Sequence, residues 1–360
     1  MSTYNPRALV IGAKILSRGI FNKPSKKYAG SPKEIGLQII RSCWNGQYFQ
    51  ASSGHFSQFW IRDFSLNARS LIRLGFSAQV EKTLRYALGR YFRRGRIATT
   101  IIGGVPVDIT TYAPDSLALL LYILRQTKNS NLAKKYKNFL ENELERFWKI
   151  VIDPQTDLVR RHRFFASMQD TIKRDSSCYD NIMVGLAAKE AAALGLRCPF
   201  GFSHERFMKR YWTGESFKDD QSGLRYTSSD AHLYAVWSDV IPDQHINQKA
   251  IGVINEKKND DPFPMIFTRT PIRFSRSLTS LLTPNYQGST IWTLSGGVYL
   301  QILKKYNPVL FKKHLESYTK LIQKHQNFFE IYTPNGQPYK TFFYKADEGM
   351  LWVANYLAAL

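Results

Sequence analysis

Helical periodicity is the sequence feature that most constrains the fold of this chain. Apolar residues recur at helical spacing in about twelve segments, whereas the alternation that marks strands is scarce. No run rich in Pro, Ser or Gly divides the chain, and no fixed repeat length relates the segments. We therefore predict one continuous all-α domain rather than two domains or a solenoid.

Several predicted helices begin and end at recognisable residues. Ser31 and Pro32 fit the N-cap and first-turn positions of one helix, and Gly75 follows the end of another. The helix that begins at Pro114 is apolar on nearly all sides, which is typical of a buried helix. The predicted helices cover residues 31–43, 61–74, 77–94, 114–124, 131–151, 177–194, 204–212, 229–239, 244–257, 290–306, 308–327 and 345–360.

Long loops separate successive pairs of these helices. They exceed the roughly 4–6 residues of an ordinary connection, and loops of such length are generally functional. Paired helices with long loops between the pairs favour an (α/α)6 toroid, a six-hairpin barrel with an inner and an outer ring and a loop-built pocket at one end. The loops in question are residues 95–113, 152–176, 213–228, 258–289 and 328–344.

We predict that residues 31–360 form the toroid and that residues 1–30 form a basic leader. Lys14 and Arg18 interrupt the only apolar stretch of the leader, which is too short for a signal peptide or a membrane span. A surface helix or a loose tail is the favoured interpretation, and contact with an anionic membrane stays open. Three scattered cysteines indicate a reducing compartment, so we expect a cytoplasmic protein.

Common motifs for metals, nucleotides and activated nucleophiles are absent from the sequence. The seven histidines form no HExxH pair, and no CxxC occurs. Neither GxxxxGK[ST], GxGxxG nor GxSxG is found. Carboxylates and aromatic residues are then the groups most able to perform chemistry.

Carboxylates in the predicted loops lie beside aromatic residues. Asp63 follows Trp60 and Arg62, a trio that could stack on a sugar ring and bind its hydroxyls. Glu330 lies among Phe and Tyr, which would disfavour its charged form and so tune a catalytic acid or base. Taken singly, each acid also has a structural interpretation: a helix cap, a first-turn acid such as Asp115, or an exposed loop glutamate.

The arrangement of these acids favours function over structure. A toroid would bring Asp63, Asp115, Asp170 and Glu330 from different loops around one opening. The second half would contribute Asp230, Trp292, and Asp347 and Glu348 with Trp352. Glycoside hydrolysis needs two facing carboxylates, of which one protonates the leaving oxygen while the other activates water. The sequence therefore predicts a carbohydrate substrate.

The motifs resemble those of the six-hairpin glycosidases, the group of neutral/alkaline invertases, trehalases, glucoamylases and glycogen-debranching glucosidases. The run FWIRDFSLNARSLIRLGF resembles their W-x-R-D helix start, and YQGSTIW resembles their Y-x-N-G-x-x-W-P element. The matches follow the expected order over about residues 55–360. The remaining segments are APDSLALLLYIL, FASMQDTIKRDSSCYDN, FFEIYTPNGQP and DEGMLWVANYLAAL.

The resemblance implies an inverting glycoside hydrolase that acts on a small, α-glucoside-like substrate, with Asp170 as general acid and Glu330 as general base. Asp175 remains a rival for the acid. The family needs no metal and no organic cofactor. Gln287 and Thr293 replace the usual Asn and Pro, which keeps a sugar-binding, phosphorylase or epimerase relative open. The expected substrate-binding residues are Trp60, Arg62, Asp63, Asp108, Asp115, Tyr179, Trp292 and Glu348.

The charge of the chain allows other partners. Lys and Arg number 50 against 28 Asp and Glu, a net charge of +22 that attracts anions. The segment 90–96 interleaves aromatic with basic residues and keeps a nucleic-acid-binding or membrane-associated scaffold open, although it leaves the acid–aromatic loops unexplained. Nucleic acid is therefore disfavoured as partner. An anionic glycan is suggested by the basic residues near Asp170, which are Arg160, Arg161, Arg163, Lys173 and Arg174.

Overall fold

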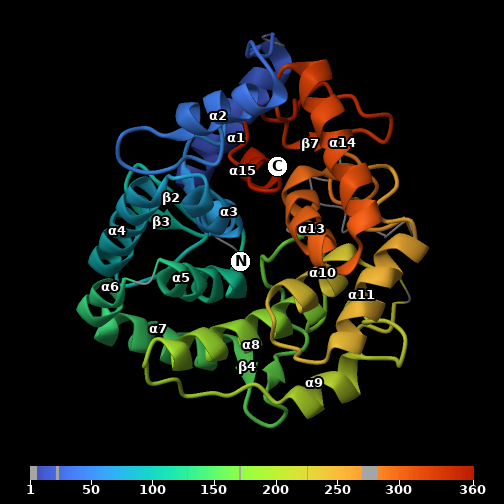
Figure 1. Ribbon diagram of the computed structural model, residues 1–360. Helices are drawn as coiled ribbons and strands as arrows, with labels where there is room; N and C mark the ends of the chain where they lie inside the picture. The colour runs from blue at the N-terminus through green and yellow to red at the C-terminus, as the bar shows by residue number, and fades with distance from the viewer. Residues whose placement is uncertain (1–5, 22–23, 128, 170–171, 225, 270–282) are drawn as a thin grey trace.

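The computed structural model describes the chain except for residues 1–5, 22–23, 128, 170–171, 225 and 270–282. Within the described ranges helices predominate, and each strand has only two or three residues. Figure 1 shows the helices arranged in two concentric layers around a closed ring. The fold is an (α/α)6 toroid, as the sequence predicted.

The inner ring is closed by contacts between neighbouring helices. Each inner helix contacts the next one in chain order, and the last contacts the first. Their burial explains why the sequence of α5 is apolar nearly all round: every residue from Pro114 to Leu124 is buried. The inner helices are α3 (Ile61–Arg73), α5 (Pro114–Gln126), α8 (Cys178–Ala193), α10 (Ser229–Trp237), α13 (Thr293–Tyr306) and α15 (Val353–Leu357).

The outer ring consists of amphipathic helices. In α2, Ser31 and Glu34 form a capping box ahead of Pro32, and one face of the helix is buried. At the end of α4, Gly95 adopts the left-handed conformation that favours glycine, with φ of 63°. The outer helices are α2 (Pro32–Cys43), α4 (Ser77–Arg94), α7 (Lys137–Val151), α9 (His204–Tyr211), α11 (Gln244–Glu256) and α14 (Pro308–His325); α1 (Pro6–Phe21) and α6 (Ser130–Lys135) complete the set of described helices.

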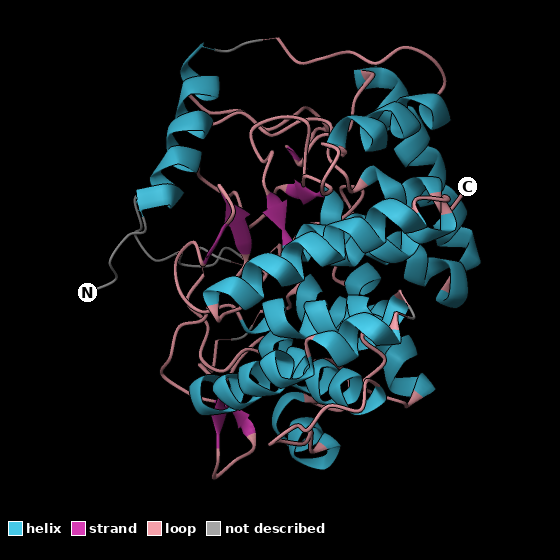
Figure 2. Ribbon diagram, turned by 90° about the vertical axis from the view of Figure 1, so that its left-hand side faces the viewer, coloured by secondary structure: helices cyan, strands magenta, loops and turns pink. Residues whose placement is uncertain are grey.

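Three small antiparallel sheets brace the loops. Figure 2 shows the strands on the same side of the helical ring as α1. The pairing of β6 with β7 sets Trp292 opposite Ile331, and therefore holds Trp292 beside the residue that follows Glu330. The sheets are β1 (Phe59–Trp60) with β2 (Thr100–Ile102) and β3 (Val105–Val107), β4 (Ile152–Asp153) with β5 (Leu158–Val159), and β6 (Ile291–Trp292) with β7 (Ile331–Tyr332).

Two predicted helices differ from the structure. The helix expected over 345–360 is wrong in its first half, because Glu348 and Met350 are held in isolated β-bridges to Phe329 and Ser52. Only Val353–Leu357 forms α15. The helix expected over 131–151 is two helices, α6 and α7, which meet at Tyr136.

The leader contains a helix, α1, rather than a loose tail throughout. Its Arg18 forms ion pairs with Asp347 and Glu348, so α1 is attached to the last loops of the toroid. Ile15 packs against a small apolar cluster that includes Trp60 and Ile102. Among the described helices, none has the length and apolar character needed to span a bilayer.

Candidate active site

Glu330 lies in a buried aromatic enclosure just ahead of β7. Its side chain accepts hydrogen bonds from the hydroxyls of Tyr286 and Tyr344, one on each carboxylate oxygen, and the residue is 2% exposed. Burial raises the pKa of Glu330 to about 7, although the two tyrosine hydroxyls act in the opposite direction. The expectation that aromatic packing disfavours the charged form is confirmed, and the exposed-loop interpretation of Glu330 is wrong.

A second buried carboxylate, Asp347, supports the Glu330 loop. The backbone N–H of Asp347 donates to Glu330 Oε2 at 3.2 Å, and the N–H of Glu330 donates to the Asp347 carbonyl at 2.9 Å. The Asp347 carboxylate accepts the Ser52 hydroxyl and the backbone N–H groups of His55 and Phe56, at 2.9 and 2.8 Å for the two amides. It therefore ties the Glu330 loop to the segment that leads into β1.

Arg62 pairs with Asp115 and not with its sequence neighbour Asp63. Arg62 Nε donates to Asp115 Oδ2 at 2.7 Å, and the Tyr179 hydroxyl donates to the same oxygen at 3.0 Å. Asp115 is fully buried and Arg62 is 8% exposed. These three side chains come from the N-terminal ends of α3, α5 and α8, and the toroid brings them together as expected.

Asp63 belongs to a tryptophan wall. Its Oδ1 accepts the indole N–H of Trp352 at 2.9 Å. The Trp352 ring stacks on Trp292, with ring centroids 6.4 Å apart and planes 29° apart. Trp292 in turn donates its indole N–H to the Tyr286 carbonyl at 2.7 Å and packs edge-on against the Tyr286 ring. The wall thus continues directly into the Glu330 enclosure.

Trp60 belongs to a separate apolar cluster. Its ring meets Phe56 edge-on at 5.6 Å, and Trp60, like Ile15 of α1, packs against the buried pair Ile102 and Val107. Because β1 ends at Trp60 and α3 begins at Ile61, the β1–β2 pairing fixes where the ring points.

Asp170 lies outside the described residues, but the chain that leads to it is placed. The Met168 carbonyl accepts the side-chain N–H of Gln287 at 3.4 Å, one residue from Tyr286. The Met168 sulfur lies 3.9 Å from the hydroxyl of Tyr234, whose ring packs edge-on against Tyr179. Met168 therefore contacts residues that adjoin both the Glu330 enclosure and the Arg62–Asp115–Tyr179 group.

Two other aspartates of this segment have opposite environments: Asp175 precedes α8, and Asp180 lies in the first turn of α8. Partial burial acts to raise the pKa of Asp175, but the His162 N–H and the Arg161 guanidinium outweigh it and lower this pKa below its ordinary value. Burial raises the pKa of Asp180 to about 6, while its oxygens accept the hydroxyls of Ser167 and Ser177. A general acid must hold its proton near neutral pH, so Asp180 suits that role better than Asp175.

Asp108 and Glu348 are engaged in contacts away from the Glu330 carboxylate. Asp108 accepts the backbone N–H and the hydroxyl of Thr99, at 3.1 and 3.2 Å, and so braces β2. Glu348 forms an ion pair with Arg18 and accepts the backbone N–H of Lys26 at 2.8 Å. Both were expected to bind substrate; Asp108 lies beside Thr99 at the start of β2, whereas Glu348 pairs in a β-bridge with Phe329, the residue before Glu330.

The basic residues that suggested an anionic glycan are partly neutralised. Arg174 is buried, and its Nη1 lies 2.8 Å from Asp230 and 3.4 Å from Asp219. Arg161 is paired with Asp175 at 2.7 Å. These cations hold loops together, which weakens the sequence argument for an anionic substrate.

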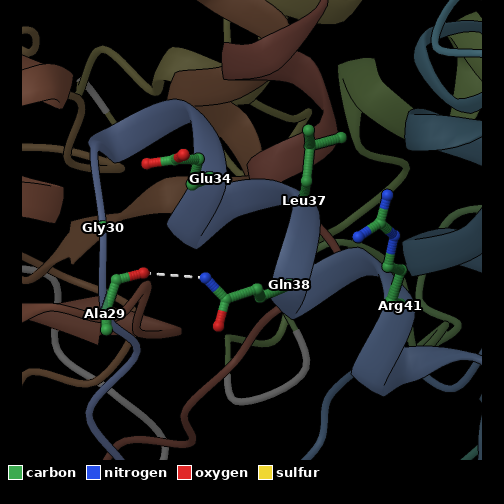
Figure 3. Close-up of a pocket in the computed structure, with 6 residues that line it drawn as sticks. All are labelled: Ala29, Gly30, Glu34, Leu37, Gln38 and Arg41. Carbon is green, nitrogen blue, oxygen red and sulfur yellow. Dashed lines mark hydrogen bonds between the residues drawn. The ribbon is translucent and has the colours of Figure 1, made fainter.

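Two surface hollows lie away from this group. One, about 360 Å³ in volume, is lined by Arg90, Arg93, Arg94 and Gly104, at the end of the outer helix α4. The other, about 320 Å³, lies at the start of α2 (Figure 3), where Gln38 donates to the Ala29 carbonyl and Glu34 is already used in the capping box. In the part of the chain that the structure describes, no cluster of His, Cys, Asp or Glu could hold a metal ion.

Sequence reasoning missed several residues of the site. Tyr286 is the first residue of the YQGSTIW motif, but of this motif only Trp292 was predicted to be a site residue. Tyr344 lies in no motif and reaches Glu330 only through the tertiary fold. Arg18 was assigned to the basic leader and Asp180 to a helix, and neither was predicted to be a site residue.

Known proteins match this chain in their three-dimensional fold but not in their sequence. No protein-family model matches the chain, and no curated protein matches it significantly. A solved wild-type glycosidase superposes with a TM-score of 0.62 over 96% of both chains at 13% identity. The GH63 mannosylglycerate hydrolase from Thermus thermophilus, in complex with glucose, gives 0.62 at 11% identity, covering 91% of this chain and 99% of that one.

A rhamnosidase from Klebsiella oxytoca with rhamnose bound gives a TM-score of 0.65 at 11% identity. The match covers 99% of this chain but 64% of the rhamnosidase, which is therefore the longer protein. At such identities the superpositions establish the fold alone. The resemblance to six-hairpin glycosidases read from the motifs is confirmed at that level.

Proposed function

We propose that the protein is an inverting glycoside hydrolase with Asp170 as general acid and Glu330 as general base. The observation that carries the proposal is the setting of Glu330: a carboxylate buried among aromatic rings, oriented by two tyrosine hydroxyls, and with its pKa raised to about 7. A catalytic base works best when its pKa lies near the working pH. A purely structural glutamate needs no such arrangement.

Three aspartates compete for the role of general acid. Asp170 occupies the position that the family motif gives to the acid, and Met168 brings the chain to the Glu330 enclosure just before it. Asp175 is disfavoured by its lowered pKa. Asp180, with its pKa raised to about 6, is the rival that the structure adds.

The remaining groups suit a single sugar ring. The Trp292–Trp352 wall offers an apolar face, while Asp63 and the Arg62–Asp115–Tyr179 group offer charged hydrogen bonds for hydroxyls. We therefore infer a small glycoside rather than a long chain. Because one structural neighbour is named a mannosylglycerate hydrolase, glycosides of glycerate belong among the first compounds to test.

The decisive experiment is a sugar-release screen with the full chain. Trehalose, sucrose, malto- and isomalto-oligosaccharides, mannosides, rhamnosides and hexosyl glycerates are incubated with the wild type and with Asp170→Asn, Asp180→Asn and Glu330→Gln. Glu316→Gln, on the exposed face of α14, and Asp157→Asn, in an exposed turn, are the matched controls. We expect release by the wild type and both controls, with loss in Glu330→Gln and in one of the two aspartate variants.

The stereochemistry of the first product distinguishes the mechanism. Proton NMR of the anomer formed at early times should show inversion, as expected for carboxylates about 6.5–9.5 Å apart that admit a water molecule. Retention would contradict the roles given to Asp170 and Glu330. Sugar phosphate formed only with added phosphate would identify a phosphorylase, and sugar binding with no product would identify a non-hydrolytic relative.

A further inference from the structure

The large apolar side chains that are exposed in the described residues are concentrated in one region. Five of the nine belong to it: three on α1 and two in the loop between β7 and α15. Phe21 is 74% exposed and Phe342 is 73% exposed. We call this region the apolar patch; it consists of Leu16, Ile20, Phe21, Phe342 and Phe343.

Contacts on the inner face of α1 fix the apolar patch in its outward position. Gly19 lies against the chain at Phe343, so that a Cβ at Gly19 would come within 2.5 Å of the Phe343 carbonyl carbon. Arg18 points inward to Asp347, with Nη1 and Oδ1 3.2 Å apart. Ile15 packs beneath the helix in the cluster that contains Trp60. Leu16 and Ile20 therefore remain on the outer face of a helix that is anchored on its inner face.

The loop half of the patch is a tight turn with aromatic residues at its tip. Lys340 and Lys345 pair as a β-bridge, and the N–H of Thr341 donates to the Tyr344 carbonyl at 2.7 Å. Phe342 and Phe343 stand at the tip with their rings edge-on, 4.8 Å apart. Two aromatic side chains are thus presented to solvent between two lysines.

The exposed charges that neighbour the apolar patch along the chain are basic, whereas Asp347 and Glu348 are buried and paired with Arg18. The sequence of α1 contains basic residues and no acidic one. Lys14, Lys27 and Lys340 are exposed near the patch in the chain, and the whole protein carries a net charge of +22. Two copies that met through this surface would bring like charges together, whereas an anionic surface would be attracted.

We infer that the apolar patch docks on the surface of an anionic lipid bilayer. A helix with apolar and basic residues, together with aromatic side chains flanked by lysines, is the combination that binds at the interface of headgroups and acyl chains. The inference is independent of the proposed catalytic function. Because Tyr344 follows Phe343 and donates to Glu330, docking through the patch would turn the loop end of the toroid toward the bilayer.

Vesicle sedimentation of the full chain tests this inference. Vesicles of phosphatidylcholine alone are compared with vesicles that also contain phosphatidylserine, at low and at high salt. We expect binding to the anionic vesicles only, weaker at high salt, and reduced at least about tenfold in the double variant Phe21→Ser, Phe342→Ser. The matched control is Val309→Ser, which removes an apolar side chain that is 81% exposed elsewhere on the surface.

The outcomes are distinguishable. Lack of binding to anionic vesicles, or equal binding by the double variant and the wild type, overturns the inference. A wild type that is dimeric in ultracentrifugation without lipid, and monomeric in the double variant, assigns the patch to a second copy and also overturns it. Thermal unfolding of each variant checks that these surface substitutions leave the fold intact.

Discussion

Glu330 and Asp347 are hydrogen-bonded to each other in both directions: the N–H of Glu330 donates to the Asp347 carbonyl at 2.9 Å, and the N–H of Asp347 donates to Glu330 Oε2 at 3.2 Å. The fully buried Asp347 carboxylate then receives donors from Ser52, His55 and Phe56. The position of the proposed base therefore depends on a second buried acid.

Asp347→Asn should weaken both the fold and the site. An amide nitrogen would face backbone N–H donors that now meet a carboxylate oxygen, which should lower the free energy of unfolding by about 2–3 kcal/mol. The negative charge of Asp347 also raises the pKa of Glu330, so its loss should move the acid limb of the pH–activity profile to lower pH. Denaturant unfolding and a pH profile measure the two effects.

Asp239→Asn is the control for this variant, because the Asp239 side chain is 75% exposed in its ion pair with Lys189. Its stability should stay within about 0.5 kcal/mol of the wild type. An Asp347→Asn variant as stable as this control, with an unmoved acid limb, would refute the supporting role of Asp347.

Activity should depend on the deprotonated form of Glu330. Because burial raises the pKa of Glu330 to about 7, activity should fall as the pH drops below about 7. Tyr344→Phe removes a hydrogen bond that lowers this pKa, so the acid limb should move to higher pH. Tyr339→Phe is the matched control, since the Tyr339 hydroxyl donates instead to the Pro284 carbonyl at 2.7 Å. An identical acid limb in both variants would contradict the assignment of the base.

Glu330 should reduce stability at the pH where it works. Its pKa rises from 4.5 in the unfolded chain to about 7 in the folded one, so the folded protein binds the proton more tightly. Stability from this group is therefore greatest below about pH 4.5 and is lost as the pH rises to about 7, by up to about 3 kcal/mol.

Glu330→Gln should accordingly unfold at a higher temperature than the wild type at about pH 8, with a smaller difference at about pH 5. Thermal unfolding at both pH values provides the measurement, and Glu316→Gln should show no such pH-dependent gain. A Glu330→Gln variant that is less stable at the higher pH would mean that the folded site does not disfavour the charged carboxylate.

Much of the fold could be predicted from the sequence because helix boundaries are set locally. Ser31 with Pro32, Pro114 and Gly75 determine ends through capping and backbone conformation, and these predictions are confirmed. The helix expected from Lys345 is one exception, because Asp347 satisfies donors from residues nearly the whole chain away. No local sequence pattern indicates hydrogen bonds between residues so far apart in the chain.

The site could be predicted as a set of residues but not as a set of pairs. Arg62 and Asp63 are adjacent in sequence, yet neighbours on a helix point in different directions, and they contact Asp115 and Trp352 respectively. Tyr344 reaches Glu330 only because the turn at 340–345 folds back toward it. Which side chains pair depends on how the loops are arranged in space, and the helical periodicity of the sequence does not determine that arrangement.

Gly54 should tolerate no side chain, because the loop from Ser52 to Phe56 wraps closely around Asp347. A Cβ at Gly54 would overlap the Asp347 carboxylate and crowd Arg18. Gly54→Ala should therefore cost about 1–3 kcal/mol and lower activity, since the strain falls on the acid that supports Glu330. Gly252→Ala in α11 is the control: its nearest neighbour would be Glu256 at 3.8 Å, and alanine should stabilise that helix by about 0.5–1 kcal/mol. Denaturant unfolding of both variants, with activity measured in parallel, tests the argument. If the two variants were equally stable, the loop around Asp347 would be able to move enough to accommodate a side chain at Gly54. The position of Glu330 would then not depend on Gly54.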